Sequence, residues 1–152
     1  MIFKEYVAAL AKELGVEIET SEDACAFSLG SAEDDKVEIL MQGNDARGAL
    51  LTCADLGEPP PEGRERLFQT LLEANDLFGD TAGATLSLVS ATGRVRLQRS
   101  DDMETLAGIG AAKALTVFAD TAAAWKRLVT DFRAAPPKEP DGQSAPPGSM
   151  LV

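Results

Sequence analysis

Short connections between three strand-like segments constrain the fold more than any other feature of this sequence. The segments are 24–29, 36–42 and 49–55. Val37, Ile39 and Met41 recur at every second position, which is the period of a strand with one buried face. The acidic turn 31–35 and the loop 43–48 are too short for a crossover between parallel strands, which needs a dozen or more residues. The sequence therefore predicts an antiparallel meander.

Helical periodicity frames this meander. Apolar residues at 3–4 spacing predict helices over 2–14, 62–78 and 111–134, and the stiff connector Gly57–Pro61 precedes the second. Alternating residues at 84–89 and 94–99 predict a second hairpin. Asp101 and Glu104 resemble a capping box before the last helix, whose start Gly108 and Gly110 weaken. The predicted fold class is α+β, in the order α-β-β-β-α-β-β-α.

The composition changes after residue 134. The segment 135–152 is rich in proline, which predicts a disordered tail. We therefore expect one α+β domain over 1–134 and a Pro-rich disordered tail over 135–152. The start of the chain carries early charges and no apolar signal region, and no apolar run reaches the roughly 18 residues of a membrane span, so we expect a cytoplasmic protein.

Charge and residue types exclude several functions. Of the 152 residues, 14 are Lys or Arg and 25 are Asp or Glu, so the net charge is −11, which opposes nonspecific binding to nucleic acids and anionic lipids. The absence of histidine excludes Ser-His-Asp and Cys-His catalysis and HExxH zinc sites. Cys25 and Cys53 form no CxxC motif, so we expect reduced, buried thiols.

Few patterns remain for chemistry. The carboxylate pairs Asp34/Asp35 and Asp101/Asp102 are candidate ligands for Mg²⁺ or Ca²⁺, but they lack calcium-loop spacing and are typical of turns and helix caps. The segment 79–83 lacks the GxxxxGK[ST] pattern and precedes a strand, which argues against a phosphate loop. The sequence therefore favours a binding module, whose hairpin edges suit the addition of an extended peptide strand.

Several short motifs follow one another between residues 67 and 132. They are Leu71-Leu72-Glu73-Ala74-Asn75-Asp76-Leu77-Phe78-Gly79, Thr81-Ala82-Gly83-Ala84-Thr85-Leu86, Gly93-Arg94-Val95-Arg96-Leu97, and Phe118 followed by Ala123-Ala124-Trp125. In this order and spacing the chain resembles the bacterial type III secretion chaperone family, the CesT/Tir-chaperone group, in a class I-like form. Residues 1–60 agree with that family in the order of elements only.

The resemblance implies a function and two sets of residues. Members of the family are homodimeric, ATP-independent chaperones that hold the N-terminal segment of a secreted effector in extended form, keep it soluble and deliver it to the secretion ATPase. The expected effector-binding residues are Phe3, Val7, Leu29, Ile39, Met41 and Leu51. The expected dimer-interface residues are Leu67, Leu71, Phe78, Leu86, Leu88 and Leu97. No cofactor and no catalytic residue is implied.

Three alternatives stay open at the level of sequence. A chaperone-like fold also suits an adaptor or regulatory protein with no secreted client. A metal-dependent enzyme would use the acidic pairs named above, and a metal titration tests for it. A structural subunit would use the same amphipathic elements for assembly alone, because an apolar stripe does not distinguish packing within a chain from packing against a partner.

Overall fold

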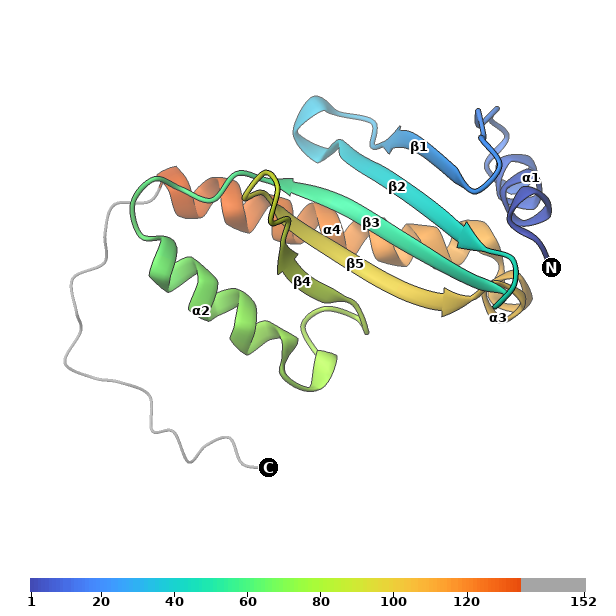
Figure 1. Cartoon of the computed structure of the whole chain (residues 1–152). Helices are drawn as coiled ribbons and strands as arrows, with labels where there is room; N and C mark the ends of the chain where they lie inside the picture. The colour runs from blue at the N-terminus through green and yellow to red at the C-terminus, as the bar shows by residue number, and fades with distance from the viewer. Residues whose placement is uncertain (135–152) are drawn as a thin grey trace.

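A single antiparallel sheet and four helices make up the domain (Figure 1). The computed structural model describes residues 1–134, so the predicted tail lies outside the described residues. In chain order the elements are α1 (Phe3–Leu14), β1 (Ala24–Leu29), η1 (Glu33–Asp35), β2 (Val37–Asn44), β3 (Ala49–Gly57), α2 (Arg64–Asn75), η2 (Asp76–Phe78), β4 (Thr85–Leu88), β5 (Val95–Asp102), α3 (Met103–Ile109) and α4 (Ala111–Ala134).

The strands lie in the order β1-β2-β3-β5-β4, and every neighbouring pair is antiparallel. The predicted meander β1-β2-β3 and the β4–β5 hairpin are therefore confirmed, and the hairpin joins the meander through β5. Directly opposed residues share a face of the sheet. Ile39 lies opposite Phe27 on one side and Ala54 on the other, which defines the inner face that carries the core.

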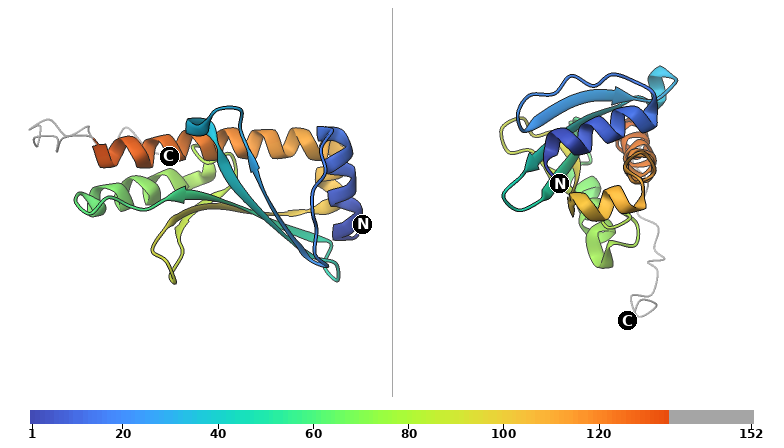
Figure 2. Two further views of the ribbon diagram at one scale, coloured as in Figure 1. Left: turned by 90° about the horizontal axis from the view of Figure 1, so that it is seen from above. Right: turned by 90° about the vertical axis from the view of Figure 1, so that its right-hand side faces the viewer.

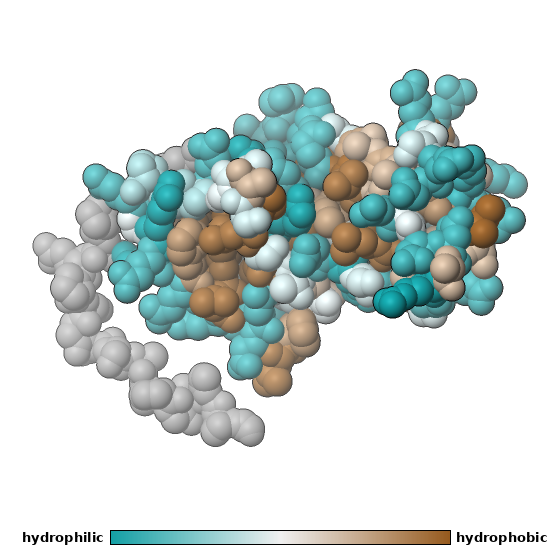
Figure 3. Space-filling view, in the orientation of Figure 1, coloured by the Kyte–Doolittle hydropathy of each residue, from teal (hydrophilic) through white to brown (hydrophobic). Residues whose placement is uncertain are grey.

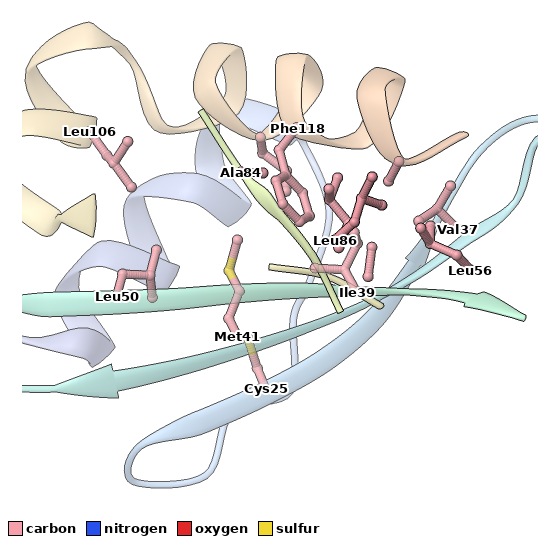
Figure 4. Close-up of a cluster of buried hydrophobic side chains, with 14 of the residues drawn as sticks. Cys25, Val37, Ile39, Met41, Leu50, Leu56, Ala84, Leu86, Leu106 and Phe118 are labelled. Atoms are coloured by element: carbon pink, nitrogen blue, oxygen red, sulfur yellow. The ribbon is translucent and has the colours of Figure 1, made fainter. Parts of the chain in front are cut away.

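The long helix α4 covers the inner face of the sheet, and α1 packs across the N-terminal half of α4 (Figure 2). The apolar stripe predicted for this helix supplies Leu115, Phe118, Ala122 and Val129 to the core. Phe118 lies above the inner face in the same cluster as Ile39 and Met41 (Figure 4). Burial of this stripe is what fixes α4 on the sheet.

Two carboxylates hold α1 in place. The Phe3 N–H at the start of α1 donates to Asp45 Oδ1 at 2.7 Å, in the turn between β2 and β3. Glu13 near the end of α1 accepts from the Ala112 N–H at 2.8 Å, at the N-terminus of α4. A free N–H group at a helix start favours an anionic acceptor, so both contacts stabilise helix ends as well as the docking of α1.

The region before α4 differs from the sequence prediction. Residues Met103–Ile109 form a separate helix, α3, and Gly110 lies between it and α4 at φ 111°. The long helix α4 begins at Ala111, as predicted. The N-cap of α3 is Asp102 and not the predicted Asp101, because the Asp102 carboxylate accepts from the Thr105 N–H at 2.9 Å. Glycine adopts this positive φ without a Cβ clash, which lets the chain turn sharply between the two helices.

The second predicted helix also divides. Helix α2 ends at Asn75, and residues 76–78 form the short helix η2, in which Leu77 has φ 58°.

Both cysteines are buried free thiols, as expected. No single helix in residues 1–134 has the length and apolarity of a membrane span; α3 and α4 pass that test only when joined across their 96° bend.

Candidate functional site: exposed edges and apolar surfaces

The outer edge of β1 offers backbone groups for pairing. Strand β1 stands at one end of the strand order, and within residues 1–134 its outer side carries only the single bridge between Thr20 and Cys25. The remaining N–H and C=O groups of such an edge form a template for an added strand. This edge is therefore a candidate site for an extended peptide.

An apolar groove runs beside this edge. Leu14 of α1, Leu29 of β1 and Leu115 of α4 contribute to a cavity of about 350 Å³ between the sheet edge and α4, and we call it the edge groove. At its rim Arg127 forms an ion pair with Asp35 at 3.0 Å, which ties α4 to η1. The groove combines apolar residues with polar and charged ones, and an apolar centre with a polar rim is the general arrangement of protein–protein interfaces.

The outer face of the sheet is partly apolar. Leu40 is 41% exposed there, and Leu51 on the neighbouring strand is partly buried. The Arg94 guanidinium donates to both carboxylate oxygens of Asp55, at 2.9 and 2.7 Å. Burial alone raises the pKa of Asp55, but the hydrogen bonds from Arg94 and from the Gly57 N–H outweigh it and lower that pKa below its ordinary value.

The three most exposed leucines and an exposed phenylalanine lie elsewhere within residues 1–134, on α2, η2 and β4. Leu72 is 70% exposed, Leu77 85%, Phe78 52% and Leu88 46%, and we call these four residues the α2–β4 patch. Hydrophobic surface gathers over α2 and over the loop that follows it in Figure 3. Exposed apolar residues that gather in this way mark an interaction surface more often than isolated ones do.

Leu77 and Phe78 occupy an unfavourable backbone conformation. Their φ angles are 58° and 56°, in the left-handed region that costs a residue with a Cβ roughly 1–2 kcal/mol. This conformation projects two large apolar side chains from the end of α2. Strain of this kind persists at sites with a role beyond local packing, so it supports a contact made by this loop.

Asn75 fixes the position of α2 against the sheet. Its Nδ2 donates to the Leu86 carbonyl at 2.9 Å, and its Oδ1 accepts from the Leu86 N–H at 2.8 Å. The side-chain amide therefore pairs with the backbone of edge strand β4 as a neighbouring strand would. Asn75 belongs to the motif Leu71–Gly79, but no local pattern in the sequence predicts this contact.

The residues expected to bind an effector fall into two groups. Leu29 lines the edge groove and Leu51 lies on the outer face, each partly exposed. The other four, Phe3, Val7, Ile39 and Met41, are at most 2% exposed. These four residues lie in the hydrophobic core of the single chain.

The residues expected at a dimer interface divide in the same way. Phe78 and Leu88 belong to the exposed α2–β4 patch. Leu67, Leu71, Leu86 and Leu97 are at most 4% exposed in the single chain. Leu72 and Leu77, the two most exposed members of the patch, were missed, although both stand in the quoted motif. An amphipathic pattern does not reveal which of two adjacent leucines faces outward.

Three of the four residues in the acidic pairs have structural partners. Asp101 forms an ion pair with Arg99 at 2.8 Å, Asp35 binds Arg127, and Asp102 caps α3. Within residues 1–134, no group of three or more His, Cys, Asp or Glu side chains is placed to hold a metal ion.

Burial raises the pKa of Cys25 to about 11 and also raises that of Cys53, so both thiols are protonated at neutral pH.

A free strand edge, a groove beside it and outward-facing leucines on one α+β domain are features typical of a protein-binding domain. The family model of the Tir chaperone protein (CesT) family matches residues 5–126. The chain therefore belongs to this family of type III secretion chaperones, and the resemblance seen in the sequence is confirmed.

Solved structures share the fold. A chain of the HopA1–SchA chaperone–effector complex has a TM-score of 0.59 and 20% identity, over 86% of this chain and 94% of that one. A chain of the ExsC–ExsE complex has a TM-score of 0.60 and 23% identity, over 83% and 93%. A chain of the heterodimeric ExoU–SpcU complex of the Pseudomonas aeruginosa type III secretion system has a TM-score of 0.57 and 27% identity, over 81% and 93%. No curated protein sequence gives a significant match.

Proposed function

We propose that this protein is an ATP-independent homodimeric chaperone for a type III secreted effector. It binds the N-terminal segment of the effector in extended form and keeps it soluble and competent for secretion. The family match over residues 5–126 is the observation that carries this proposal. The solved chaperone–effector complex with the same fold supports it.

The extended client segment adds to the outer edge of β1 and places apolar side chains in the edge groove. Leu29 contacts the client there, and Leu51 does so on the outer face, while Phe3, Val7, Ile39 and Met41 support these surfaces from the core. Ordering a flexible segment costs conformational entropy, so one short contact is not enough. A client that follows both the edge and the outer face buries the larger area that offsets this cost.

The α2–β4 patch forms the homodimer interface. Phe78 and Leu88 make direct contacts, and the buried residues Leu67, Leu71, Leu86 and Leu97 hold the patch in shape. Burying exposed leucines in a second copy removes their apolar area from water. The net charge of −11 opposes further, nonspecific association. The dimer works in the cytoplasm by binding alone, with no catalytic step, and hands its client to the secretion ATPase.

The test begins with the partner that copurifies with the tagged chain from its own bacterium under secretion conditions. The purified partner is then mixed with the purified chain without nucleotide, and the complex is treated with a protease. We expect a 2:1 complex of chaperone and client in which a stretch near the client's N-terminus is protected. A partner that is not secreted, bound through a folded domain, would contradict the proposal and favour an adaptor.

A pair of variants separates the client site from the dimer interface. Leu29→Glu places a charge in the edge groove, and we expect it to weaken client binding at least tenfold while leaving the dimer intact. Ala8→Glu is the matched control, because Ala8 is exposed on α1 and does not line the edge groove. Equal loss of binding in both variants would place the client elsewhere.

A further inference from the structure

A second pocket lies at the opposite side of α4 from the edge groove. It has a volume of about 170 Å³ and lies between α3, α4 and the inner face of the sheet, and we call it the α3–α4 pocket. Leu106 and Phe118 form its apolar wall, while Ile109 and Val117 stand at its mouth, 56% and 50% exposed. Two exposed apolar residues beside an apolar hollow indicate an unfilled binding position.

The same chain carries a projection that suits this pocket. Leu77, 85% exposed, stands out from the end of α2 on a backbone held at positive φ. One leucine side chain matches a small apolar pocket in chemistry and in scale. Leu77 and the α3–α4 pocket therefore form a complementary pair on one molecule.

Projection and pocket lie on the same side of the domain. The loop 79–83 joins them: Arg99, which lines the pocket, donates to the Ala82 carbonyl at 2.8 Å, and Trp125 of α4 donates to the Asp80 carbonyl at 3.0 Å. In Figure 1 the end of α2 lies below the sheet, and α3 lies at the right-hand end of the sheet. In an isologous dimer each projection would have to meet the partner's pocket, and a two-fold axis near loop 79–83 is the arrangement that this requires.

Charge on the two surfaces is complementary. Exposed Asp76 and Asp80 flank the projection. Lys113 is exposed on α4, one helical turn before Val117 of the pocket, and belongs to none of the ion pairs within residues 1–134. The positive charge of this lysine favours an acidic partner segment, such as Asp76–Asp80 of a second copy. Acidic residues outnumber basic ones in this chain, 25 to 14.

We propose that Leu77 of each protomer inserts into the α3–α4 pocket of a second copy, with Asp76 or Asp80 facing Lys113. This inference rests on the proposed homodimer and specifies how the α2–β4 patch continues to α3 and α4. Each pocket is incomplete without the leucine of the partner copy.

Disulfide trapping between two copies tests the contact. Leu77→Cys and Val117→Cys are introduced into separate chains that carry different tags and are expressed together, so a bond between the new thiols joins two molecules. We expect a mixed disulfide dimer under mild oxidation. The matched control replaces Val117→Cys by Leu40→Cys, which is 41% exposed on the outer face of the sheet and should give no mixed dimer. The native thiols are buried and serve as an internal background.

The molar mass of the unmodified protein separates the two levels of the proposal. A monomer at micromolar concentration would overturn the homodimer and this contact together. A dimer that gives no mixed disulfide with Val117→Cys would overturn the contact alone. A dimer with the disulfide, whose dissociation constant rises about tenfold or more in Leu77→Ala while Leu40→Ala leaves it unchanged, would support the contact.

Discussion

Gly43 shows how one missing side chain positions α1. A Cβ built at this residue of β2 would lie 2.5 Å from the Cβ of Phe3 and 2.6 Å from its ring. Phe3 is fully buried, so it has no room to withdraw. The close approach of helix and strand at this point therefore requires glycine.

We predict that Gly43→Ala destabilises the domain by about 1–3 kcal/mol, because overpacking displaces α1 or bends β2. Urea unfolding measures the change. Gly108→Ala is the control, since a Cβ there meets nothing within 4 Å and alanine favours a helix. In a double-mutant cycle with Phe3→Gly, which removes every side-chain atom that the new Cβ would meet, Gly43→Ala should cost less than it does in the wild type. Additive effects of the two changes would contradict a clash between them.

The Asp55–Arg94 pair predicts a dependence of stability on pH. The pKa of Asp55 is lowered in the folded state, so its contribution is present above the unfolded pKa of about 3.9 and is lost as the pH falls through the folded value. Because the Asp55 side chain is 40% exposed, we expect solvent to limit this contribution to about 1 kcal/mol or less.

The measurement compares the wild type with Asp55→Asn in chemical denaturation from pH 7 to pH 2. The wild type should be the more stable at pH 7, and the two curves should converge as the pH falls through the lowered pKa of Asp55 in the folded state. A constant difference across the whole range would assign the effect to packing instead of charge.

At the scale of elements, Asn75 joins α2 to β4. We predict that Asn75→Asp costs about 1–3 kcal/mol, because the carboxylate has no N–H to donate to the Leu86 carbonyl and repels it. Asn44→Asp is a matched control, since Asn44 only accepts, from the Arg47 N–H, and a carboxylate keeps that bond. Thermal unfolding of both variants checks the prediction, and equal melting temperatures would contradict it.

Most elements were predictable from the sequence because their periodicities agree with short-range turn signals. The boundaries of β1 were predicted correctly. Strand β2 begins one residue later and ends two residues later than predicted, and β3 ends two residues later. Helix α3 was not predicted, because Gly108 weakens the helical pattern and the strand β5 continues into the residues interpreted as its cap. The order of the strands in the sheet could not be predicted from the sequence, because the pairing of β5 with β3 is a long-range contact that no local pattern encodes.

At the scale of the whole molecule, the buried or exposed state of adjacent leucines decides assembly. Leu71 is 4% exposed and Leu72 is 70% exposed on the same helix. Both are apolar and one position apart, so the sequence predicted an interface in this region but not which leucine points outward. Only the packing of α2 against β4 distinguishes the two.

The pair gives a prediction for the assembly. Leu72→Asp should keep the melting temperature of the monomer fold and weaken the dimer, because it adds a charge to the α2–β4 patch. Leu71→Asp should instead lower stability by several kcal/mol, since it places an unpaired charge in the core. Light scattering gives the mass and circular dichroism the melting temperature. An unchanged dimer in Leu72→Asp would remove α2 from the interface.

The position of α4 at the end of the described chain has a consequence for synthesis. The five strands described within residues 1–134 all lie before residue 103, but the helix that covers their inner face ends at residue 134. The Glu13 carboxylate of α1 likewise cannot accept its hydrogen bond from the Ala112 N–H until Ala112 has been synthesised. At about 5–20 residues per second, the ribosome exposes an uncovered apolar sheet for seconds before α4 arrives. A nascent chain of this protein is thus briefly in need of the protection that the finished protein is proposed to give to another.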